Sequence, residues 1–435
     1  MNKKIFILYI LTIYYFLQDS FKKVIPSTAE LISALVSSYS AHISTAYIFF
    51  NLKKHFSTYY KIIQLPNFNY LNIYRRILLF VINFILHSKF NIYLCLDDTF
   101  SPRFSKKAPN AHFISKKGAY LLAQVRIVIS IIIEIDNKKI FSIPILVKLV
   151  DYSNANKKKN KYNTTKLTSA AAMIRLIDYW LKDKFKKKLI LLTDAWYMRK
   201  NLVMPAVIKH SATVIGRVRK DTVLHLPIEK KKGKTRGRPR KYGEKVTKDY
   251  ISKLPLKKMK LFLYSQCRTV EYKSIIVYPR FLLGKIKCKA VYVRIESLKQ
   301  KKYALILCTD HKKSEEEIIK SYAKRWKIET MFRELKQIFG LNELWQQEKM
   351  SLNKMTSLVM SAYSATSILN YWSAIYDKID MSEMLPWRKK NVFTVGVMKV
   401  FLFKLLCKYN VRKEISKIYK EKIDFEEQIW GYFRK

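Results

Sequence analysis

The spacing of apolar residues changes near residue 90 of this 435-residue chain. Before that point they form long runs, such as residues 31–36 and 71–87, which predict helices. Ser27 and Glu30 have capping-box spacing just ahead of the first of these runs, so we expect a helix to start there. We therefore interpret residues 1–88 as a helical DNA-binding region. Two neighbouring arginines in the second run are available for phosphate contacts: Arg75 and Arg76.

The chain opens with basic residues followed by the apolar residues 5–17, and this stretch resembles the core of a signal peptide. The polar residues Gln18, Asp19 and Ser20 follow directly, without a small-x-small cleavage site. The run is also shorter than the roughly 20 apolar residues that a membrane-spanning helix needs. We therefore expect a buried first helix and a cytoplasmic, nucleoid-associated protein that has no membrane partner.

From residue 91 the pattern predicts strands. Three runs rich in Ile, Val and Leu, at 92–96, 120–135 and 140–150, are joined by short turns. A helical pattern at 166–185 and a buried strand at 189–192 come next. Three strands, a helix and a further strand follow the order of a ribonuclease-H-like core. In open α/β sheets of this kind, function lies at the carboxyl ends of the strands.

The rest of the chain completes this core around a second β-rich segment. Residues 212–219 and 303–308 predict further strands, and Ser314 begins a long helix. The expected fold class is therefore α/β, a ribonuclease-H-like catalytic core interrupted by a β-rich insertion, with helical regions at both ends. The expected domains are a helical region at 1–88, a catalytic core at 89–220 and 301–345, an insertion at 221–300 and a helical C-terminal region at 346–435.

The net charge indicates an anionic partner. The chain has 84 Lys and Arg against 32 Asp and Glu, a formal net charge of +52. Its 49% hydrophobic and 14% aromatic residues exclude a disordered polyelectrolyte. Self-repulsion on this scale is tolerable when nucleic acid or an acidic membrane surface neutralises it. An A/T-rich coding genome is an alternative source of part of the Lys excess, although it does not explain the Arg-rich stretches.

The cysteines and histidines indicate neither a disulfide framework nor a zinc site. The five cysteines are scattered without CxxC spacing, and the seven histidines form no HExxH pattern. We expect small buried hydrophobes in a reducing compartment at all five cysteine positions: Cys95, Cys267, Cys288, Cys308 and Cys407.

Two carboxylates follow predicted buried strands in a chain that is poor in acids: Asp97 and Asp194. Their mutual repulsion would be costly without a cation between them. Hard cations such as Mg²⁺ take carboxylate oxygens and leave positions open for water and phosphate. A strand-ending Asp is also common in turns, which is the alternative interpretation of both residues.

The helix that starts at Ser314, with Glu317 in capping-box spacing, carries a stripe of chemically active side chains. On an α-helix, offsets of 3, 7 and 14 from the first member place the stripe within an arc of about 60°. Its members are Tyr322, Arg325, Glu329 and Lys336. One interpretation is a solvated face with an i,i+4 Arg–Glu pair. The other is a carboxylate metal ligand flanked by phosphate-binding groups.

The segment YAKRWKIETMFRELK matches in full the Y-(2)-R-(3)-E-(6)-K signature of one large group of DDE insertion-sequence transposases, which this chain resembles. LDDTF is similar to the first motif of that group, and LLTDAWY is similar to the second. Those enzymes carry a β-rich insertion between the second Asp and the Glu, and here this interval is longer than the one between the two aspartates. The resemblance covers residues 91–345.

The resemblance implies a triad of Asp97, Asp194 and Glu329 that holds Mg²⁺ in a two-metal site, with Mn²⁺ as an alternative. It also implies phosphate contacts to the transposon end from the other stripe residues: Tyr322, Arg325 and Lys336. Asp98 is the alternative ligand to Asp97, and the spacing to Thr99 favours Asp97. The implied partners are double-stranded DNA, as transposon ends and target, and further copies of the chain in a homo-oligomer on DNA.

A basic segment at 230–241, KKKGKTRGRPRK, lies within the expected insertion. Its core resembles an AT-hook, an extended peptide that places Arg side chains in a narrow A·T minor groove: Arg236, Arg238 and Arg240. A solvated basic linker is the alternative. Either form adds phosphate affinity that depends steeply on salt.

Together these features predict a DNA transposase, a metal-dependent nuclease and strand transferase that cleaves transposon ends and joins them to target DNA. One alternative is a transposase-derived DNA-binding protein without catalytic turnover, against which the intact triad argues. Another is a membrane-surface protein anchored by residues 5–17, which leaves the helix stripe unexplained.

Overall fold

The computed structural model describes most of the chain. The described residues are 2–20, 22–50, 52–86, 89, 91–116, 118–135, 139–151, 161–182, 188–228, 242–296, 303–376, 394–421 and 427–429.

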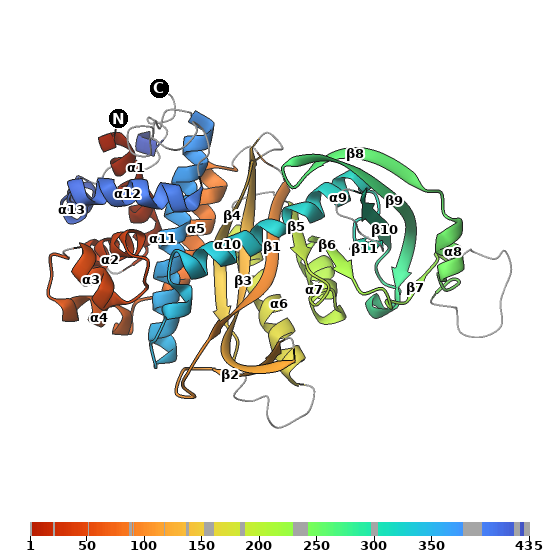
Figure 1. Cartoon of the computed structure of the whole chain (residues 1–435), viewed down its shortest axis with the longest axis horizontal. Coiled ribbons are helices and arrows are strands. Elements are labelled where there is room, and N and C mark those ends of the chain that lie inside the picture. The colour runs from red at the N-terminus through yellow and green to blue at the C-terminus, as the bar shows by residue number, and fades with distance from the viewer. Residues whose placement is uncertain are drawn as a thin grey trace.

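Apolar helices from both ends of the chain gather at one end of the molecule (Figure 1). The N-terminal helices are α1 (Asn2–Leu17), α2 (Ile25–Ser37), α3 (Ile43–Phe50), α4 (Phe56–Gln64) and α5 (Tyr70–Phe84). The C-terminal helices are α11 (Lys349–Tyr376), α12 (Val395–Lys408) and α13 (Val411–Lys420). Because α2 packs against α11, α12 and α13, the two ends of the chain share one hydrophobic core.

The first helix is buried, as its apolar run predicts. Within α1, Tyr9, Ile10 and Leu11 are inaccessible to solvent. In the described parts of the chain, no helix is long and apolar enough to cross a membrane.

The predicted capping box of Ser27 and Glu30 is wrong, because α2 starts before its apolar run. Val24 is the N-cap residue and makes no side-chain cap, while Pro26 occupies the first turn, where its fixed φ and missing N–H are tolerated. Both predicted capping residues therefore lie inside the helix. Glu30 is buried there and accepts a hydrogen bond from the Tyr59 hydroxyl at 3.0 Å.

The arginine pair of α5 is not available for phosphate as predicted. Arg76 donates from Nε to Asp19 Oδ2 at 2.8 Å, and Arg75 lies 3.7 Å from the same carboxylate. The prediction is wrong for Arg76, since its guanidinium ties α5 to the end of α1.

A mixed sheet of eleven strands, counted over the described residues, forms the centre of the molecule. The strands of its first half are β1 (Asn91–Pro102), β2 (His112–Lys116), β3 (Ala119–Ile135), β4 (Lys139–Leu149), β5 (Lys188–Thr193) and β6 (Thr213–Val218). Strand β3 pairs antiparallel with β4 and β1, and β5 and β6 continue the sheet parallel to β1. The antiparallel hairpins and the parallel crossover follow the strand order that the sequence predicts.

The second half of the sheet extends from β6 through β11. Its strands are β7 (Leu224–His225), β8 (Lys257–Leu263), β9 (Gln266–Pro279), β10 (Cys288–Ile295) and β11 (Ala304–Cys308). These strands all pair antiparallel and curve away from the helical end in Figure 1. The β-rich segment thus belongs to the same sheet as the strands before it.

Strand β1 is longer than predicted and does not end at Asp97. It continues to Pro102 because β3 pairs with it along that length. Its parallel partner β5 ends at Thr193, which pairs with Leu96. Asp97 and Asp194 each come one residue later, so both lie at the carboxyl end of the parallel strands.

Five further helices accompany the sheet: α6 (Lys161–Leu181), α7 (Lys200–His210), α8 (Lys248–Lys253), α9 (Glu315–Lys324) and α10 (Trp326–Gln337). The capping box of Ser314 and Glu317 is confirmed at the start of α9. In Figure 1, α9 and α10 follow one another end to end, and α10 crosses in front of the sheet.

The single long helix predicted after Ser314 is wrong, because it divides at Arg325. The Arg325 N–H bonds to the Tyr322 carbonyl and the Ile328 N–H bonds to the Arg325 carbonyl, both over the shorter i→i+3 distance. The Arg325 carbonyl also accepts a hydrogen bond from Cys95 Sγ at 3.7 Å. This tightened turn joins the helix pair to β1.

The cysteine prediction is correct for three positions and wrong for two. Cys95, Cys288 and Cys308 are buried, whereas Cys267 and Cys407 are exposed. All five are free thiols.

Candidate active site

Asp194 stands at the start of a tight turn after β5. Its Oδ1 accepts the backbone N–H groups of Trp196 at 2.9 Å and Tyr197 at 3.1 Å. Asp side chains often close turns in this way by bonding to the backbone two or three residues on. The buried strand and the turn together hold the carboxylate in one orientation.

Asp97 and Asp98 have different partners, since successive strand residues point to opposite faces of a sheet. Asp97 Oδ2 accepts from Arg325 at 3.0 Å, and its Oδ1 accepts the Asp98 N–H at 2.8 Å. The Asp98 carboxylate pairs with Lys166 of α6 at 2.6 Å and accepts from the Tyr197 hydroxyl at 3.2 Å. Asp97 is therefore the aspartate that faces α9 and α10.

Arg325 joins two of the three predicted metal ligands. Its guanidinium donates to Glu329 Oε1 at 2.7 Å as well as to Asp97, and only 14% of its side chain is exposed. The tightened turn places Arg325 at the start of α10, about one helical turn before Glu329. Residues far apart in the sequence thus meet in one hydrogen-bonded group.

The two aspartates, Asp97 and Asp194, resist ionisation. Burial raises the pKa of Asp97 to about 7; the neighbouring Asp194 carboxylate adds to the rise, and Arg325 opposes it. Burial also raises the pKa of Asp194, against the two N–H donors of its turn. Acids with raised pKa values at the end of a sheet mark a place where an additional cation would be stabilising.

The donor set of Asp97, Asp194 and Glu329 fits Mg²⁺ or Mn²⁺, because these hard cations prefer carboxylate oxygens. In the part of the chain that the structure describes, no three His, Cys, Asp or Glu side chains are grouped closely enough to hold a metal ion. At this site the Arg325 guanidinium lies between Asp97 and Glu329. A cation shared by the three carboxylates would require Arg325 to move from that position.

The remaining residues of the predicted DNA contacts are spread more widely. The ring of Tyr322 lies beside Arg325, whose guanidinium is 5.8 Å from its centroid. Lys336 lies at the far end of α10, with its ammonium 4.7 Å from the ring centroid of Phe100 in β1. The predicted AT-hook residues lie outside the described residues: Arg236, Arg238 and Arg240.

A hollow of about 300 Å³ opens beside Asp194, and we call it the catalytic hollow. Its lining residues are Asp194, Ala195, Arg217, Val218, Arg219, Lys220, Tyr322 and Arg325. Half of these residues are Arg or Lys, so the hollow suits a phosphate backbone.

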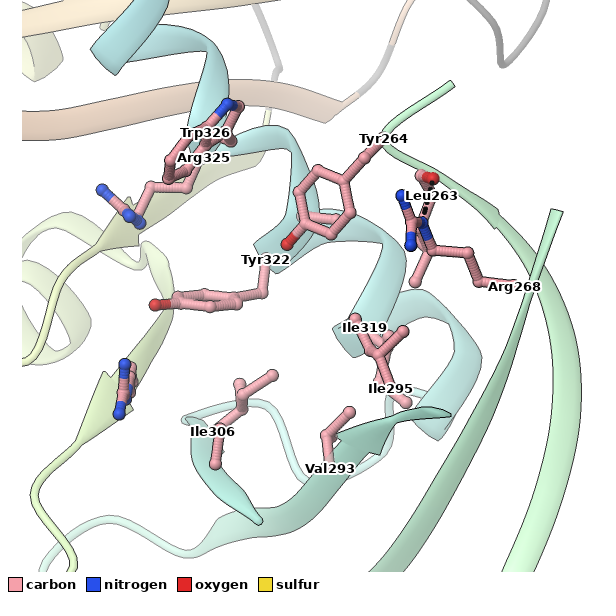
Figure 2. Close-up of a pocket in the computed structure, with 13 residues that line it drawn as sticks. Leu263, Tyr264, Arg268, Val293, Ile295, Ile306, Ile319, Tyr322, Arg325 and Trp326 are labelled. Atoms are coloured by element: carbon pink, nitrogen blue, oxygen red, sulfur yellow. Dashed lines mark hydrogen bonds between the residues drawn. The ribbon is translucent and has the colours of Figure 1, made fainter. Parts of the chain in front are cut away.

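A second hollow of about 460 Å³ adjoins the first at Arg217, Tyr322 and Arg325. Figure 2 shows the rings of Tyr264 and Tyr322 on one side of it and aliphatic side chains on the other: Val293, Ile295 and Ile306. Arg268 lines it as well. An apolar floor bordered by guanidiniums can accept a flat apolar group that carries an anion, as a nucleotide does.

The sequence did not predict three residues of the site: Lys166, Arg217 and Tyr264. Lys166 pairs with Asp98, and Arg217 lines the hollow beside Asp194, only because distant segments pack together. Tyr264 and Ser265 form a two-residue turn between β8 and β9 in which both have positive φ, 53° and 64°. Such turns favour Asn and Gly, so this one carries no turn signal in the sequence.

The family model of the transposase DDE domain matches residues 150–357. The matched segment contains Asp194, Glu329 and the whole of α9 and α10, and Asp97 precedes it. The match supports a DDE transposase. The transposase family implies DNA as the substrate, and DDE transposases generally use divalent metals. No curated protein matches the chain significantly.

Proposed function

We propose that the chain is a DNA transposase that cleaves transposon ends and joins them to target DNA by metal-dependent phosphoryl transfer. The observation that carries this proposal is the contact of Arg325 with both Asp97 and Glu329, with Asp194 near Asp97 where the parallel pairing of β1 and β5 ends. The family match to the transposase DDE domain also supports the proposal, and it does so without Asp97, which precedes the matched residues 150–357.

The mixed sheet supports a ribonuclease-H-like core. The order β4, β3, β1, β5 and β6, antiparallel and then parallel, is compatible with such a core at residues 89–220 and 301–345. We assign residues 221–300 to the β-rich insertion, with helical regions at 1–88 and 346–435. We expect the protein to act on paired ends as a homo-oligomer, associated with the nucleoid.

In this proposal Asp97, Asp194 and Glu329 hold Mg²⁺ or Mn²⁺, and Asp98 does not. We favour Asp97 over Asp98 because Asp97 faces α9 and α10 through Arg325, whereas the Asp98 carboxylate binds Lys166 and the Tyr197 hydroxyl. Bound divalent metal supplies activation of the attacking hydroxyl and stabilisation of the leaving oxygen. The buried strands and the Asp194 turn supply fixed positions for the carboxylates, so little reorganisation is needed.

Arg325 and Tyr322 bind the DNA phosphate in this proposal. Both line the catalytic hollow, and the Arg325 guanidinium lies next to Asp97 and Glu329. A phosphate in the hollow offers Arg325 a charged acceptor in place of these carboxylates. When the Arg325 guanidinium exchanges the carboxylates for a DNA phosphate, Asp97 and Glu329 become available to bind metal. DNA binding is therefore coupled to release of these two acids. Lys336, at the far end of α10 beside Phe100, contacts phosphates more distant from the bond that is cut.

A cleavage assay tests the proposal. The purified chain is incubated with a labelled duplex that carries the terminal inverted repeat of the encoding element, with Mg²⁺ or with EDTA. We expect nicking at the repeat boundary with Mg²⁺ only. Glu329→Gln should bind the duplex normally and lose nicking by at least about a hundredfold. Undiminished nicking by this variant would contradict the assigned triad.

The second candidate is a transposase-derived DNA-binding protein without turnover. The contact of Arg325 with both Asp97 and Glu329 favours it, because one guanidinium then occupies an oxygen of two of the three proposed metal ligands. Tight binding of the repeat duplex by the unmodified chain without cleavage in Mg²⁺ or Mn²⁺ would establish this candidate.

A further inference from the structure

A third hollow, of about 500 Å³, lies beyond Asp194 and is separate from the pocket of Figure 2. We call it the outer hollow. It is lined by the turn after β5 and the start of α7, by the end of β6 and by the 3-10 turn at Arg280–Leu282. The lining residues are Ala195, Met198, Arg199, Lys200, Val218, Arg219, Asp221, Thr222, Val223, Arg280 and Phe281.

The outer hollow is strongly basic. Arg199, Lys200, Arg219 and Arg280 line it against a single acid, Asp221. Within the described residues, no ion pair joins any of these side chains to another. Four cations that converge without neutralising partners favour an anionic ligand with several charges. The first turn of α7 adds no acidic side chain to this surface.

The outer hollow continues the catalytic hollow. Ala195, Val218 and Arg219 line both, so a strand that leaves the carboxylates past Asp194 enters the outer hollow directly. Tyr322 and Arg325 line the catalytic hollow but not the outer one. The outer hollow thus extends the basic surface from the catalytic hollow away from Tyr322 and Arg325.

The chemistry of phosphoryl transfer needs two such surfaces. The attacking and leaving oxygens lie roughly in line on opposite sides of the phosphorus, so two DNA segments approach the carboxylates from different directions. We propose that the outer hollow binds backbone phosphates of the target strand, while the helices α9 and α10 hold the transposon end. This inference rests on the proposed transposase function and assigns Lys200 and Arg280 as target-binding residues.

The test uses the full chain with Lys200→Gln and Arg280→Gln combined. Both side chains are exposed and line only the outer hollow, so their replacement leaves the catalytic hollow unchanged. A matched control removes the same charge from exposed lysines near the ends of α7 and α12: Lys209→Gln with Lys408→Gln. Two labelled duplexes are compared by fluorescence anisotropy. One carries the transposon end alone, and the other is a branched duplex in which that end is joined to a target strand.

The double variant should bind the branched duplex at least about tenfold more weakly. The slope of the logarithm of its binding constant against the logarithm of salt concentration should fall in magnitude by about two. It should bind the linear end as the control does. Equal losses on both duplexes, or no loss on the branched one, would overturn the inference. Failure of the unmodified chain to cleave the repeat duplex would count against the proposed function alone, because the comparison of the two duplexes needs no turnover.

Discussion

Asp97 and Asp98 are neighbours in the sequence but have opposite surroundings in the folded chain. Asp97 is buried beside Asp194 and Arg325, and its pKa is raised to about 7. Asp98 is held by Lys166 and the Tyr197 hydroxyl. The motif in the sequence favoured Asp97 through its spacing to Thr99 and kept Asp98 as the alternative, but it could not show their different partners, because these lie on α6, on α10 and in the turn after β5.

The raised pKa of Asp97 predicts a pH-dependent stability in EDTA. Its pKa in the folded chain, about 7, exceeds its ordinary value of 3.8. The stability that the protonated form contributes is therefore complete below about pH 4 and lost as pH rises through 7. Asp97→Asn should raise the free energy of unfolding by up to about 4 kcal/mol at pH 8 and by only about 1.6 kcal/mol at pH 5. Thermal unfolding at the two pH values measures this difference.

Asp310→Asn is the control for that experiment, because the pKa of Asp310 is lowered where that of Asp97 is raised. Burial raises the pKa of Asp310, but its hydrogen bonds with Lys188 and the Lys312 N–H lower the pKa by more. Stability from such a carboxylate is lost only in acid below its ordinary pKa, so this variant should be equally destabilised at pH 5 and pH 8. If Asp97→Asn behaves in the same pH-independent way, Asp97 is not the buried acid described here.

At the scale of elements, the long apolar strands and the capping box of α9 were predictable because their signals are local. The extension of β1 from Asp97 to Pro102 was not predictable, since most of these residues are polar and they pair only because β3 lies beside them. Helix α7 was missed as well, and Pro205 inside it removes the usual helix signal. The break at Arg325 depends on a contact with Cys95, which no helical pattern contains.

The end of α10 shows the same dependence on distant segments. After α10, Gly340 has a φ of +68° and packs on the backbone of Ser40 and Ala41. Lys399 of α12 donates to the carbonyls of Ser38 and Ile338 at the same junction, and burial lowers its pKa to about 7. Helix α10, which carries Glu329, is therefore fixed to helices from both ends of the chain.

Gly340→Ala should disrupt this junction. An added Cβ would lie 2.4 Å from the backbone nitrogen of Ala41, and the positive φ is unfavourable for Ala. We expect the free energy of unfolding, measured by thermal unfolding, to fall by more than about 3 kcal/mol, or the variant to be insoluble on expression. Gly118→Ala is the matched control, because Gly118 also has a positive φ but open space around it, and should cost about 1 kcal/mol. Equal effects at both glycines would show that backbone strain alone matters.

For the whole molecule, the net charge of +52 predicted an anionic partner, and the two adjoining basic hollows give part of that charge a location. The joint packing of the helices from residues 1–88 with those after residue 345 was not predicted (Figure 1). Both regions are hydrophobic on several sides, so their local patterns identify helices without identifying partners. Similarly, no local pattern places Arg217 in the catalytic hollow or Arg280 in the outer hollow.

The central claim is that Asp97, Asp194 and Glu329 act together as the metal-binding acids of a transposase. The most direct measurement is the rate of Mg²⁺-dependent nicking at the repeat boundary by Asp97→Asn and Asp98→Asn, at equal occupancy of the repeat duplex. The account predicts that Asp97→Asn loses at least about a hundredfold in rate, while Asp98→Asn stays within about tenfold of the unmodified chain. Full activity of Asp97→Asn, or a greater loss in Asp98→Asn, would contradict it.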